Sequence, residues 1–204
     1  MRLLIAEDEN PCPGLWLADI QEQTKHLTSL TNNLITLSRM EEERTRLQMI
    51  DFPFSDVVEE TVQSFQALAR TQNKTFETSI QPMISLYGDE KSLTQLVSIL
   101  LDNAMKYSTP EGEISLRLEK AGNNVKLSVY NTADSIDREQ LSHLFDRFYR
   151  TDKSRSSRTG GYGLGLSIAA AVVNTHKGKI TATTQDEHSL LITVTLPLKT
   201  QERK

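Results

Sequence analysis

Apolar residues recur with two different periods, and the change of period divides the chain into a helical part and a mixed part. Residues 16–47 contain no proline or glycine, and leucines fall at positions 27, 30, 34 and 37. This spacing of three and four residues predicts one long amphipathic helix with an apolar stripe. Because such a helix cannot bury its stripe alone, we expect residues 20–40 to pair with another helix, either within the chain or in a second copy.

The part that follows, from about residue 50, alternates between helical and strand-like patterns. Helical spacing predicts helices over residues 55–72, 89–107 and 165–176 and a short one at 137–145, with Ser55 as the expected N-cap of the first. Alternation of apolar and polar residues predicts strands at 75–80, 83–87, 113–119, 125–130, 179–184 and 190–196. We therefore expect an α+β fold, a two-layer α/β sandwich with a mixed, mostly antiparallel sheet, preceded by the long helix.

Composition excludes several classes of protein. The 204 residues carry a net charge of −4 and a single cysteine, so neither an internal disulfide nor a cysteine metal cluster is expected. The sequence has no run of about 18 apolar residues and no secretory signal, which predicts no membrane segment in this chain and a cytoplasmic location. The acidic balance argues against a general nucleic-acid binder.

The nine glycines are unevenly distributed. Four of them, at positions 160, 161, 163 and 165, lie directly before a predicted helix. Glycine backbone and a helix N-terminus together favour a phosphate site, although a flexible helix entry is the alternative. No predicted strand precedes the glycines and no Gly-Lys-Ser/Thr ends them, so Rossmann and Walker A interpretations fail. Residues 147–158 hold five basic residues and one acid, which favours a polyphosphate ligand over an ordinary solvated loop.

The most apolar predicted helix carries polar residues near its C-terminal end. Asn103 and Lys106 are three positions apart and therefore share a face. An amide oxygen is a reasonable Mg²⁺ ligand where phosphates supply further oxygens. The alternative is a buried asparagine bonded to the backbone.

Three segments together resemble motifs of one family, the sensor histidine kinases. Residues 100–108 (LLDNAMKYS) resemble the N box, residues 144–150 (LFDRFYR) the F box, and residues 161–166 (GYGLGL) the second glycine box. Order and spacing match over about residues 50–198, and residues 34–41 (LITLSRME) resemble the second helix of the family's dimerisation domain. The resemblance implies the GHKL (Bergerat-type) ATP-binding fold shared with type II topoisomerases and related chaperones, with ATP and Mg²⁺ under a lid at about residues 146–162.

The resemblance also implies a binding role for each motif. Asn103 is the implied Mg²⁺ ligand. The phosphate oxygens would be met by Lys106, Arg147 or Arg150 and by backbone donors of Gly161, Gly163 and Gly165, in a box completed by Tyr162, Leu164 and Leu166. The purine would be met by Tyr107, Asn131 and the first glycine box, with Ala133, Ser135 and Ile136.

Two departures from the family pattern predict a weakened site. The first glycine box, usually Asp-x-Gly-x-Gly-Ile, aligns with residues 131–136 (NTADSI), where Asn131 replaces the adenine-reading Asp and Ala133 and Ser135 replace both glycines. If those positions need positive φ, each substitution costs about 1 kcal/mol or more. Ile99 stands where the family often has a second polar Mg²⁺ ligand. An ATP-driven conformational protein of the topoisomerase or chaperone type would need an acidic general base at the same position, so Ile99 disfavours that function as well.

None of the four histidines fits the family's phosphoacceptor motif, His-Glu-x-x-Thr-Pro. His26 is followed by leucine, and His143, His176 and His188 are expected on the surface. No catalytic residue is therefore assigned within the chain. The implied reaction is transfer of the ATP γ-phosphoryl group to a histidine supplied in trans, with a response regulator or an intact histidine kinase as partner. The alternative is a non-catalytic dimerisation or regulatory module with weak or no ATP binding.

These observations predict four segments. Residues 1–14 are a receiver-like or adventitious segment, because Met1–Glu9 resembles the opening strand of a response-regulator receiver. Residues 15–49 form the dimerisation-type helix without its phosphoacceptor helix. Residues 50–198 form the ATP-binding domain, and residues 199–204 form a tail.

Overall fold

The computed structural model describes residues 24, 28, 31, 47–149 and 163–198. Along residues 47–149 and 163–198 the elements follow in the order β1 (Met49–Pro53), α2 (Phe54–Thr71), β2 (Thr75–Ile80), β3 (Ser85–Asp89), α3 (Glu90–Tyr107), β4 (Glu113–Ala121), β5 (Asn124–Thr132), the 3-10 helix η1 (Arg138–His143), α4 (Gly165–Thr175), β6 (Lys179–Thr183) and β7 (Ser189–Pro197). Each predicted helix and strand over residues 55–196 is present, with boundaries shifted by a few residues.

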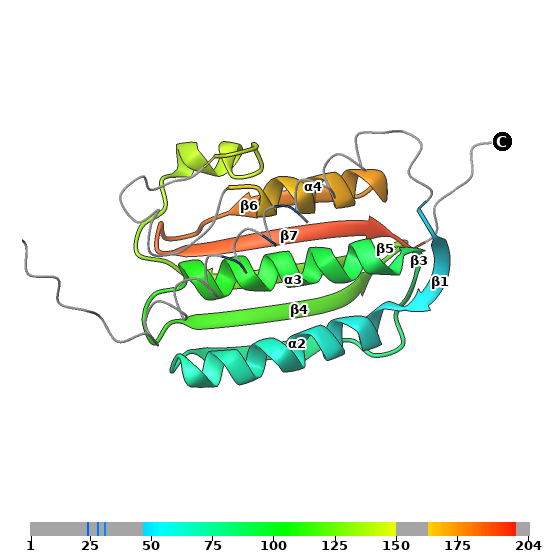
Figure 1. Ribbon diagram of the computed structural model, residues 1–204, viewed down its shortest axis with the longest axis horizontal. Helices are drawn as coiled ribbons and strands as arrows, with labels where there is room; N and C mark the ends of the chain where they lie inside the picture. The colour runs from blue at the N-terminus through cyan, green and yellow to red at the C-terminus, as the bar shows by residue number, and fades with distance from the viewer. Residues whose placement is uncertain (1–23, 25–27, 29–30, 32–46, 150–162, 199–204) are drawn as a thin grey trace, which may run out of the picture.

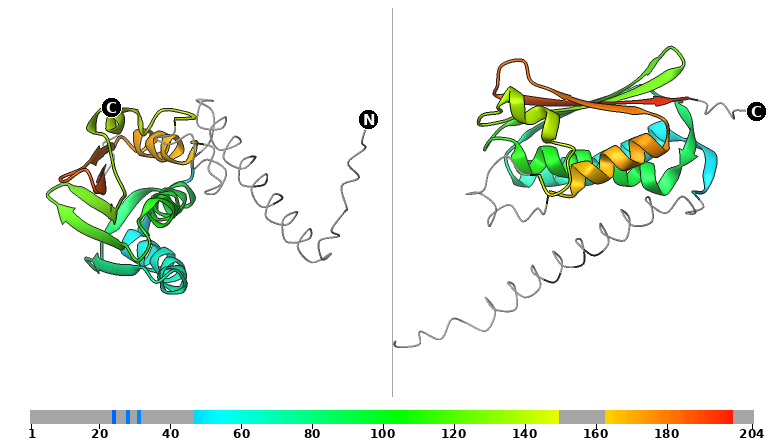
Figure 2. Two further views of the ribbon diagram at one scale, coloured as in Figure 1. Left: turned by 90° about the vertical axis from the view of Figure 1, so that its left-hand side faces the viewer. Right: turned by 90° about the horizontal axis from the view of Figure 1, so that it is seen from above.

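The main sheet is mixed and mostly antiparallel, as the sequence predicts. Its five strands lie in the order β2-β4-β5-β7-β6, and only the β2–β4 pair is parallel. Strands β1 and β3 form a separate antiparallel pair. The helices α2, α3 and α4 cover one face of the main sheet (Figures 1 and 2), which gives the expected two-layer sandwich.

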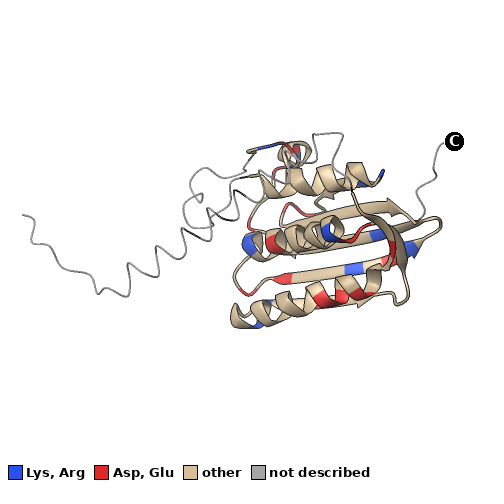
Figure 3. Ribbon diagram, turned by 45° about the vertical axis from the view of Figure 1, so that its right-hand side comes forward, with Lys and Arg blue, Asp and Glu red and all other residues tan. Residues whose placement is uncertain are grey.

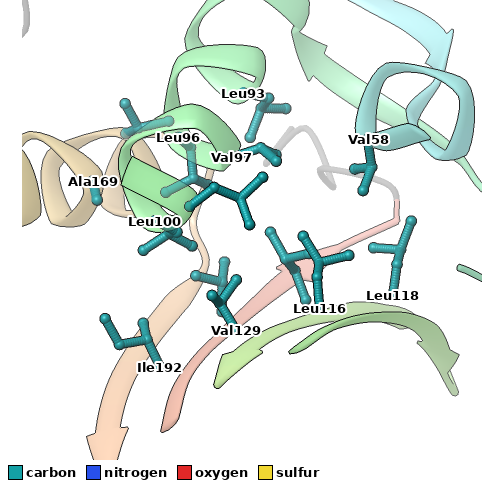
Figure 4. Packing of buried hydrophobic residues seen from close by; sticks show 14 of the residues in the cluster. Val58, Leu93, Leu96, Val97, Leu100, Leu116, Leu118, Val129, Ala169 and Ile192 are labelled. Carbon is teal, nitrogen blue, oxygen red and sulfur yellow. The ribbon is translucent and has the colours of Figure 1, made fainter. Parts of the chain in front are cut away.

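Helix α3 lies at the centre of the hydrophobic core. Its leucines at positions 93, 96, 100 and 101 are fully buried, with the i, i+3, i+4 spacing of a helix that packs along one face. Leu96 and Leu100 face strand residues such as Leu116, Val129 and Ile192 of the sheet (Figure 4). Within the helical layer, α3 lies between α2 and α4 and packs against both (Figure 1), so it joins all parts of this layer.

The prediction that Ser55 is the N-cap of α2 is wrong. The helix starts one residue earlier, its N-cap is Pro53, and no side chain caps it. The buried Ser55 hydroxyl instead donates to Gln81 O (2.7 Å) and accepts from the Ile84 N–H (3.0 Å). A serine at a helix start can bond to the first-turn amides or to other backbone groups, and here it bonds to the segment between β2 and β3.

His176 was expected on the surface and is buried. It is the C-cap residue of α4 and only 3% exposed. Its Nδ1 donates to Val172 O (2.8 Å), and its Nε2 accepts the Asp89 N–H (3.0 Å), which fixes the neutral tautomer. Burial lowers the pKa of His176, an effect only partly offset by the Val172 carbonyl and the Asp89 charge. His143 and His188 are exposed, as predicted.

The predicted long helix lies almost entirely outside the described residues, as do residues 1–14 and 199–204. Thr24, Thr28 and Thr31 are helical and exposed, and the Thr28 hydroxyl donates to Thr24 O (2.9 Å), one helical turn back. Among the residues described, no helix has the length and apolar character that a bilayer crossing requires.

Candidate functional site

Segments far apart in the sequence meet at the C-terminal half of α3. A β-carbon placed on Gly165, at the start of α4, would lie 3.5 Å from Ile99 Cγ2 on α3. Directly after α3, the Thr109 hydroxyl lies 3.0 Å from the Thr132 hydroxyl at the end of β5. These two contacts bring the N box beside both segments that resemble glycine boxes.

A third contact adds the F box to this cluster. The Phe148 N–H donates to Gly163 O (3.0 Å), so this backbone hydrogen bond joins the F box to the second glycine box. Both residues have left-handed backbone, with φ of +62° at Phe148 and +70° at Gly163. A β-carbon on Gly163 would lie 2.7 Å from Tyr149 O, so any other residue at this position would strain the backbone. Sequence patterns gave no signal for the left-handed Phe148, which is 65% exposed.

The polar residues of α3 remain accessible at this end of the helix. Asn103 is half-buried, and within residues 47–149 and 163–198 its side chain makes no hydrogen bond. Lys106 forms an ion pair with Asp102 (2.6 Å), one turn back on the same helix, where acidic and basic residues lie side by side (Figure 3). Tyr107 is 42% exposed. The chain thus presents an amide, an ammonium group and a phenol in one turn of helix.

The second glycine box begins a helix, as predicted. Leu164 is buried and is the N-cap residue of α4, and its carbonyl accepts bonds from the Ser167 hydroxyl (2.8 Å) and the Ile168 N–H (3.0 Å). Gly165 and Leu166 start α4, where backbone N–H groups lack partners within the helix and favour an anion. The other predicted phosphate ligands, Arg150, Gly161 and Tyr162, lie outside the described residues, whereas Arg147 is described and exposed.

Asn131 lies at the end of β5 and is 2% exposed. Its Nδ2 donates to Thr132 O (2.7 Å), which leaves the amide oxygen as the acceptor it would offer to a purine amino group. The acceptor role that the sequence predicts for Asn131 stays a prediction.

Hydrogen bonds to the β6–β7 turn hold the loop after Asn131. The Ala133 N–H donates to His188 O, and the Ile136 N–H donates to Glu187 O, both at 2.7 Å. The His188 ring contributes a third contact, from Nδ1 to Asp134 O (2.7 Å). No local sequence pattern connects His188 to this role, because its partner is 54 positions away.

The loop that contains Ala133 and Ser135 has none of the left-handed backbone strain that the loss of two glycines could introduce. Neither Ala133 nor Ser135 is among the non-glycine residues with positive φ in the described part of the chain. The backbone of this loop continues the β5–β7 ladder, whose last pair is Thr132 and Ser189. The replacement of two family glycines therefore introduces no left-handed strain here.

The residues present fit a magnesium–nucleotide ligand better than a bare metal ion. No group of three or more His, Cys, Asp or Glu side chains lies together within the described residues, so the protein alone offers no chelating cluster there. The half-buried amide of Asn103 supplies one oxygen of the kind Mg²⁺ accepts when phosphates supply others. Ile99, one turn earlier, faces Gly165 with an aliphatic side chain that cannot ligate a metal.

A family model confirms the relationship that the motifs indicate. Residues 88–200 match HATPase_c, described as the histidine kinase-, DNA gyrase B-, and HSP90-like ATPase family, over more than half of the 204 residues. The chain belongs to this family. The HATPase_c match includes the segments that resemble the N box, the F box and both glycine boxes.

Curated relatives are sensor kinases, in agreement with the resemblance. The chain is 32% identical over 191 residues to the sensor protein DltS of Streptococcus agalactiae, covering 93% of this chain and 48% of DltS. It is 34% identical over 181 residues to the phosphate regulon sensor protein PhoR of Pseudomonas aeruginosa, covering 85% of this chain and 39% of PhoR. The chain thus spans less than half the length of these relatives.

Solved structures confirm the HATPase_c fold. The histidine kinase AdeS of Acinetobacter baumannii superposes with a TM-score of 0.75 at 24% identity, covering 91% of this chain and 85% of that chain. The catalytic domain of the histidine kinase ThkA gives a TM-score of 0.65 at 23% identity, covering 74% of this chain and 96% of that chain.

Proposed function

We propose that the chain is the ATP-binding catalytic portion of a two-component sensor histidine kinase. It would transfer the γ-phosphoryl group of ATP to a histidine supplied by another polypeptide. The observation that carries the proposal is the meeting of four motif segments at one end of α3, through the Ile99–Gly165, Thr109–Thr132 and Phe148–Gly163 contacts. Phosphoryl transfer of this kind depends mainly on positioning and charge neutralisation, and these segments could provide both.

Each part of the site has a proposed role in binding. The Asn103 amide oxygen would hold Mg²⁺, which when bound neutralises phosphate charge. Lys106 would meet phosphate oxygens after exchanging its ion pair with Asp102, a surface pair that holds it only weakly. Arg147 would supply a second cation, and the backbone N–H groups at the start of α4 would bind the same phosphates. Asn131 and Tyr107 would contact the purine.

The proposed partner is a histidine-bearing polypeptide and, after it, a response regulator. None of the four histidines has the phosphoacceptor motif, so the acceptor would come from an intact kinase. The histidine kinase ThkA has been solved in complex with the response regulator TrrA, which makes a similar partner a reasonable proposal for this chain. A cytoplasmic site of action and self-association through residues 20–40 remain predictions of the same kind.

A second candidate function rests on the replaced motif residues. Ile99 cannot ligate Mg²⁺, and Ala133 places a methyl group where the family has a glycine. A chain in which these changes abolish binding would be a regulatory module that pairs with an intact kinase.

Nucleotide titration separates the two candidates. We expect ATP with Mg²⁺ to bind in the micromolar-to-millimolar range, and Asn103→Ala to weaken binding about tenfold, the loss of one contact to a charged ligand. Asn174→Ala, an exposed asparagine near the end of α4 remote from the motifs, is the matched control and should leave binding unchanged. No binding at several millimolar ATP would favour the regulatory module.

Phosphoryl transfer needs its own measurement. Labelled ATP should give an acid-labile label on an added polypeptide that carries a phosphoacceptor helix, and none on this chain alone. Acid-labile label on the isolated chain would contradict the assignment of the acceptor in trans.

A further inference from the structure

The C-terminal end of α3 has an unusual cap. The residue directly after the helix is not glycine: its C-cap residue, Ser108, has extended backbone with φ −68° and ψ 146°. The Ser108 N–H donates to Ala104 O (3.0 Å), which satisfies one carbonyl of the last turn. The last four carbonyls of any helix lack partners within it and need them from elsewhere. The Ser108 hydroxyl gives Met105 O one long bond (3.5 Å), so the carbonyls of Met105 and Ser108 can still accept donors from outside the helix.

Lys74 supplies the missing donor from 31 positions earlier in the sequence. Its Nζ donates to Met105 O (2.7 Å), to Ser108 O (3.2 Å) and to the Ser108 hydroxyl (2.5 Å). Three acceptors match the three protons of an ammonium group, and a cation at this helix end also complements the helix dipole. Burial lowers the pKa of Lys74, so the ammonium is held there against a desolvation cost.

The backbone around Lys74 fixes the direction of this side chain. Asn73 is left-handed, with φ of +54°, and turns the chain at the end of α2. The Lys74 N–H then donates to Ala69 O (3.0 Å), and the Thr75 N–H donates to Gly112 O (3.0 Å) where β2 begins. Lys74 is therefore anchored on both sides before it reaches across to α3.

The acceptors of Lys74 surround the accessible turn of α3. Met105 and Ser108 flank Lys106 and Tyr107, and Met105 is two residues from Asn103. Ser108 precedes Thr109, whose hydroxyl joins the end of β5. We propose that Lys74 is a positioning residue of the nucleotide site, which holds the last turn of α3 so that Asn103 and Tyr107 meet their ligands. This role rests on the proposed function, since it presupposes a nucleotide.

Lys74→Met tests the role because it keeps the length of the side chain and removes the donors. We expect the Kd for ATP with Mg²⁺ to rise about tenfold, the loss of a charge-assisted cap, and Lys74→Arg to recover part of the affinity. Two matched variants accompany it. Lys91→Met removes an exposed lysine at the opposite end of α3, and Ser55→Ala removes a buried hydroxyl with two bonds at the start of α2.

Backbone amide exchange gives a readout that does not depend on nucleotide. In Lys74→Met, without ligand, the amides of residues 105–108 should exchange about tenfold faster, because the last turn frays when its carbonyls lose their donor. Lys91→Met and Ser55→Ala should leave both these amides and the Kd at their wild-type values.

The outcomes separate the two proposals. If the wild-type chain binds nucleotide and Lys74→Met binds it with the same Kd, the positioning role is overturned and the proposed function stays intact. An equal rise of Kd in Ser55→Ala shows general destabilisation and also overturns the positioning role. A wild-type chain that binds no nucleotide overturns the proposed function, and with it the role of Lys74 in binding, while faster exchange would still show a structural cap.

Discussion

The two ends of the α3–α4 pair differ in how their polar groups are used. At one end, Asp89 accepts bonds from the N–H (2.8 Å) and hydroxyl (2.7 Å) of Ser92, and from the Gln48 N–H (2.9 Å). The Asp89 N–H is bonded to His176, whose other nitrogen is bonded to Val172 O. Every polar atom named at this end has a partner within the fold, so we call these residues the closed end.

At the other end the same two helices present polar groups outward. Asn103 is half-buried without a side-chain hydrogen bond in the described part of the chain, and Tyr107 is exposed. Left-handed backbone at Phe148 and Gly163 directs the chain around the start of α4. The contrast teaches that polar residues at helix ends stabilise the fold where partners meet them, whereas those without partners in the described part of the chain are the ones we propose for ligand binding. We call this second group the open end.

The largest expected effect removes the acceptor of the closed end. Asp89→Ala should lower the free energy of unfolding by about 2–3 kcal/mol, because it deletes the N-cap of α3 and the bond to Gln48. Asn103→Ala, at the open end, should change the same free energy by less than about 0.5 kcal/mol. Denaturant unfolding of both variants measures the difference. Equal losses would show that the two ends do not differ in this way.

An exchange of glycine and alanine should have an intermediate effect. Gly163→Ala should cost about 1–2 kcal/mol, because its backbone is left-handed and the new methyl group would meet Tyr149 O. Ala133→Gly should cost only about 0.5–1 kcal/mol, since its loop is held by sheet-like bonds and glycine adds backbone entropy alone. Thermal unfolding of both variants is the measurement. A stabilised Ala133→Gly would mean that the loop does carry strain.

The smallest expected effect is a pH dependence at the closed end. Burial lowers the pKa of His176, so between its lowered pKa and the ordinary value near 6.5 the unfolded chain binds more protons than the folded one. Stability from this group is present above about pH 6.5 and is lost as the pH falls through that window, with a slope of at most about 1.4 kcal/mol per pH unit. His176→Gln should flatten this slope in denaturant titrations at several pH values.

Asp89 contributes in a separate, lower pH range. Desolvation raises the pKa of Asp89, but hydrogen bonds from Ser92 and Gln48 outweigh it and hold the pKa below its ordinary value. Stability from Asp89 is therefore present above pH 4 or so and is lost at still lower pH, as the carboxylate is protonated. A His176→Gln variant with an unchanged slope directly below pH 6.5 would contradict the assignment to His176.

Sequence patterns predicted most of the elements because local physics determines them. Helical spacing predicted α3 over residues 89–107, and alternation of apolar and polar residues predicted β4 and β5 at 113–119 and 125–130. The Gly163–Leu166 helix start was likewise visible in the sequence. These signals lie within a few residues of the structure they produce.

The residues whose positions or roles were not predicted all depend on partners that are distant in the sequence. The surface position expected for His176 is wrong because its burial depends on a bond to Asp89, which is 87 positions away. Ser55 is a residue type that often caps helices, but its hydrogen-bond partners lie 26 and 29 positions away in the β2–β3 turn. His188 and Lys74 likewise act through residues that no local pattern connects to them. Sequence reasoning therefore located the motifs of the candidate site but not the residues that hold them.

The hydrogen bond between Phe148 and Gly163 has a consequence for how this family can diversify. It holds the backbone of Phe148 and Gly163 at one point of the framework, so the Phe148 N and Gly163 O atoms that flank any connecting segment are fixed 3.0 Å apart. The entropy of closing a loop rises only with the logarithm of its length, by about 0.6 kcal/mol for each doubling. Evolution can therefore lengthen, shorten or exchange this segment at little thermodynamic cost while both helices and the sheet stay as they are.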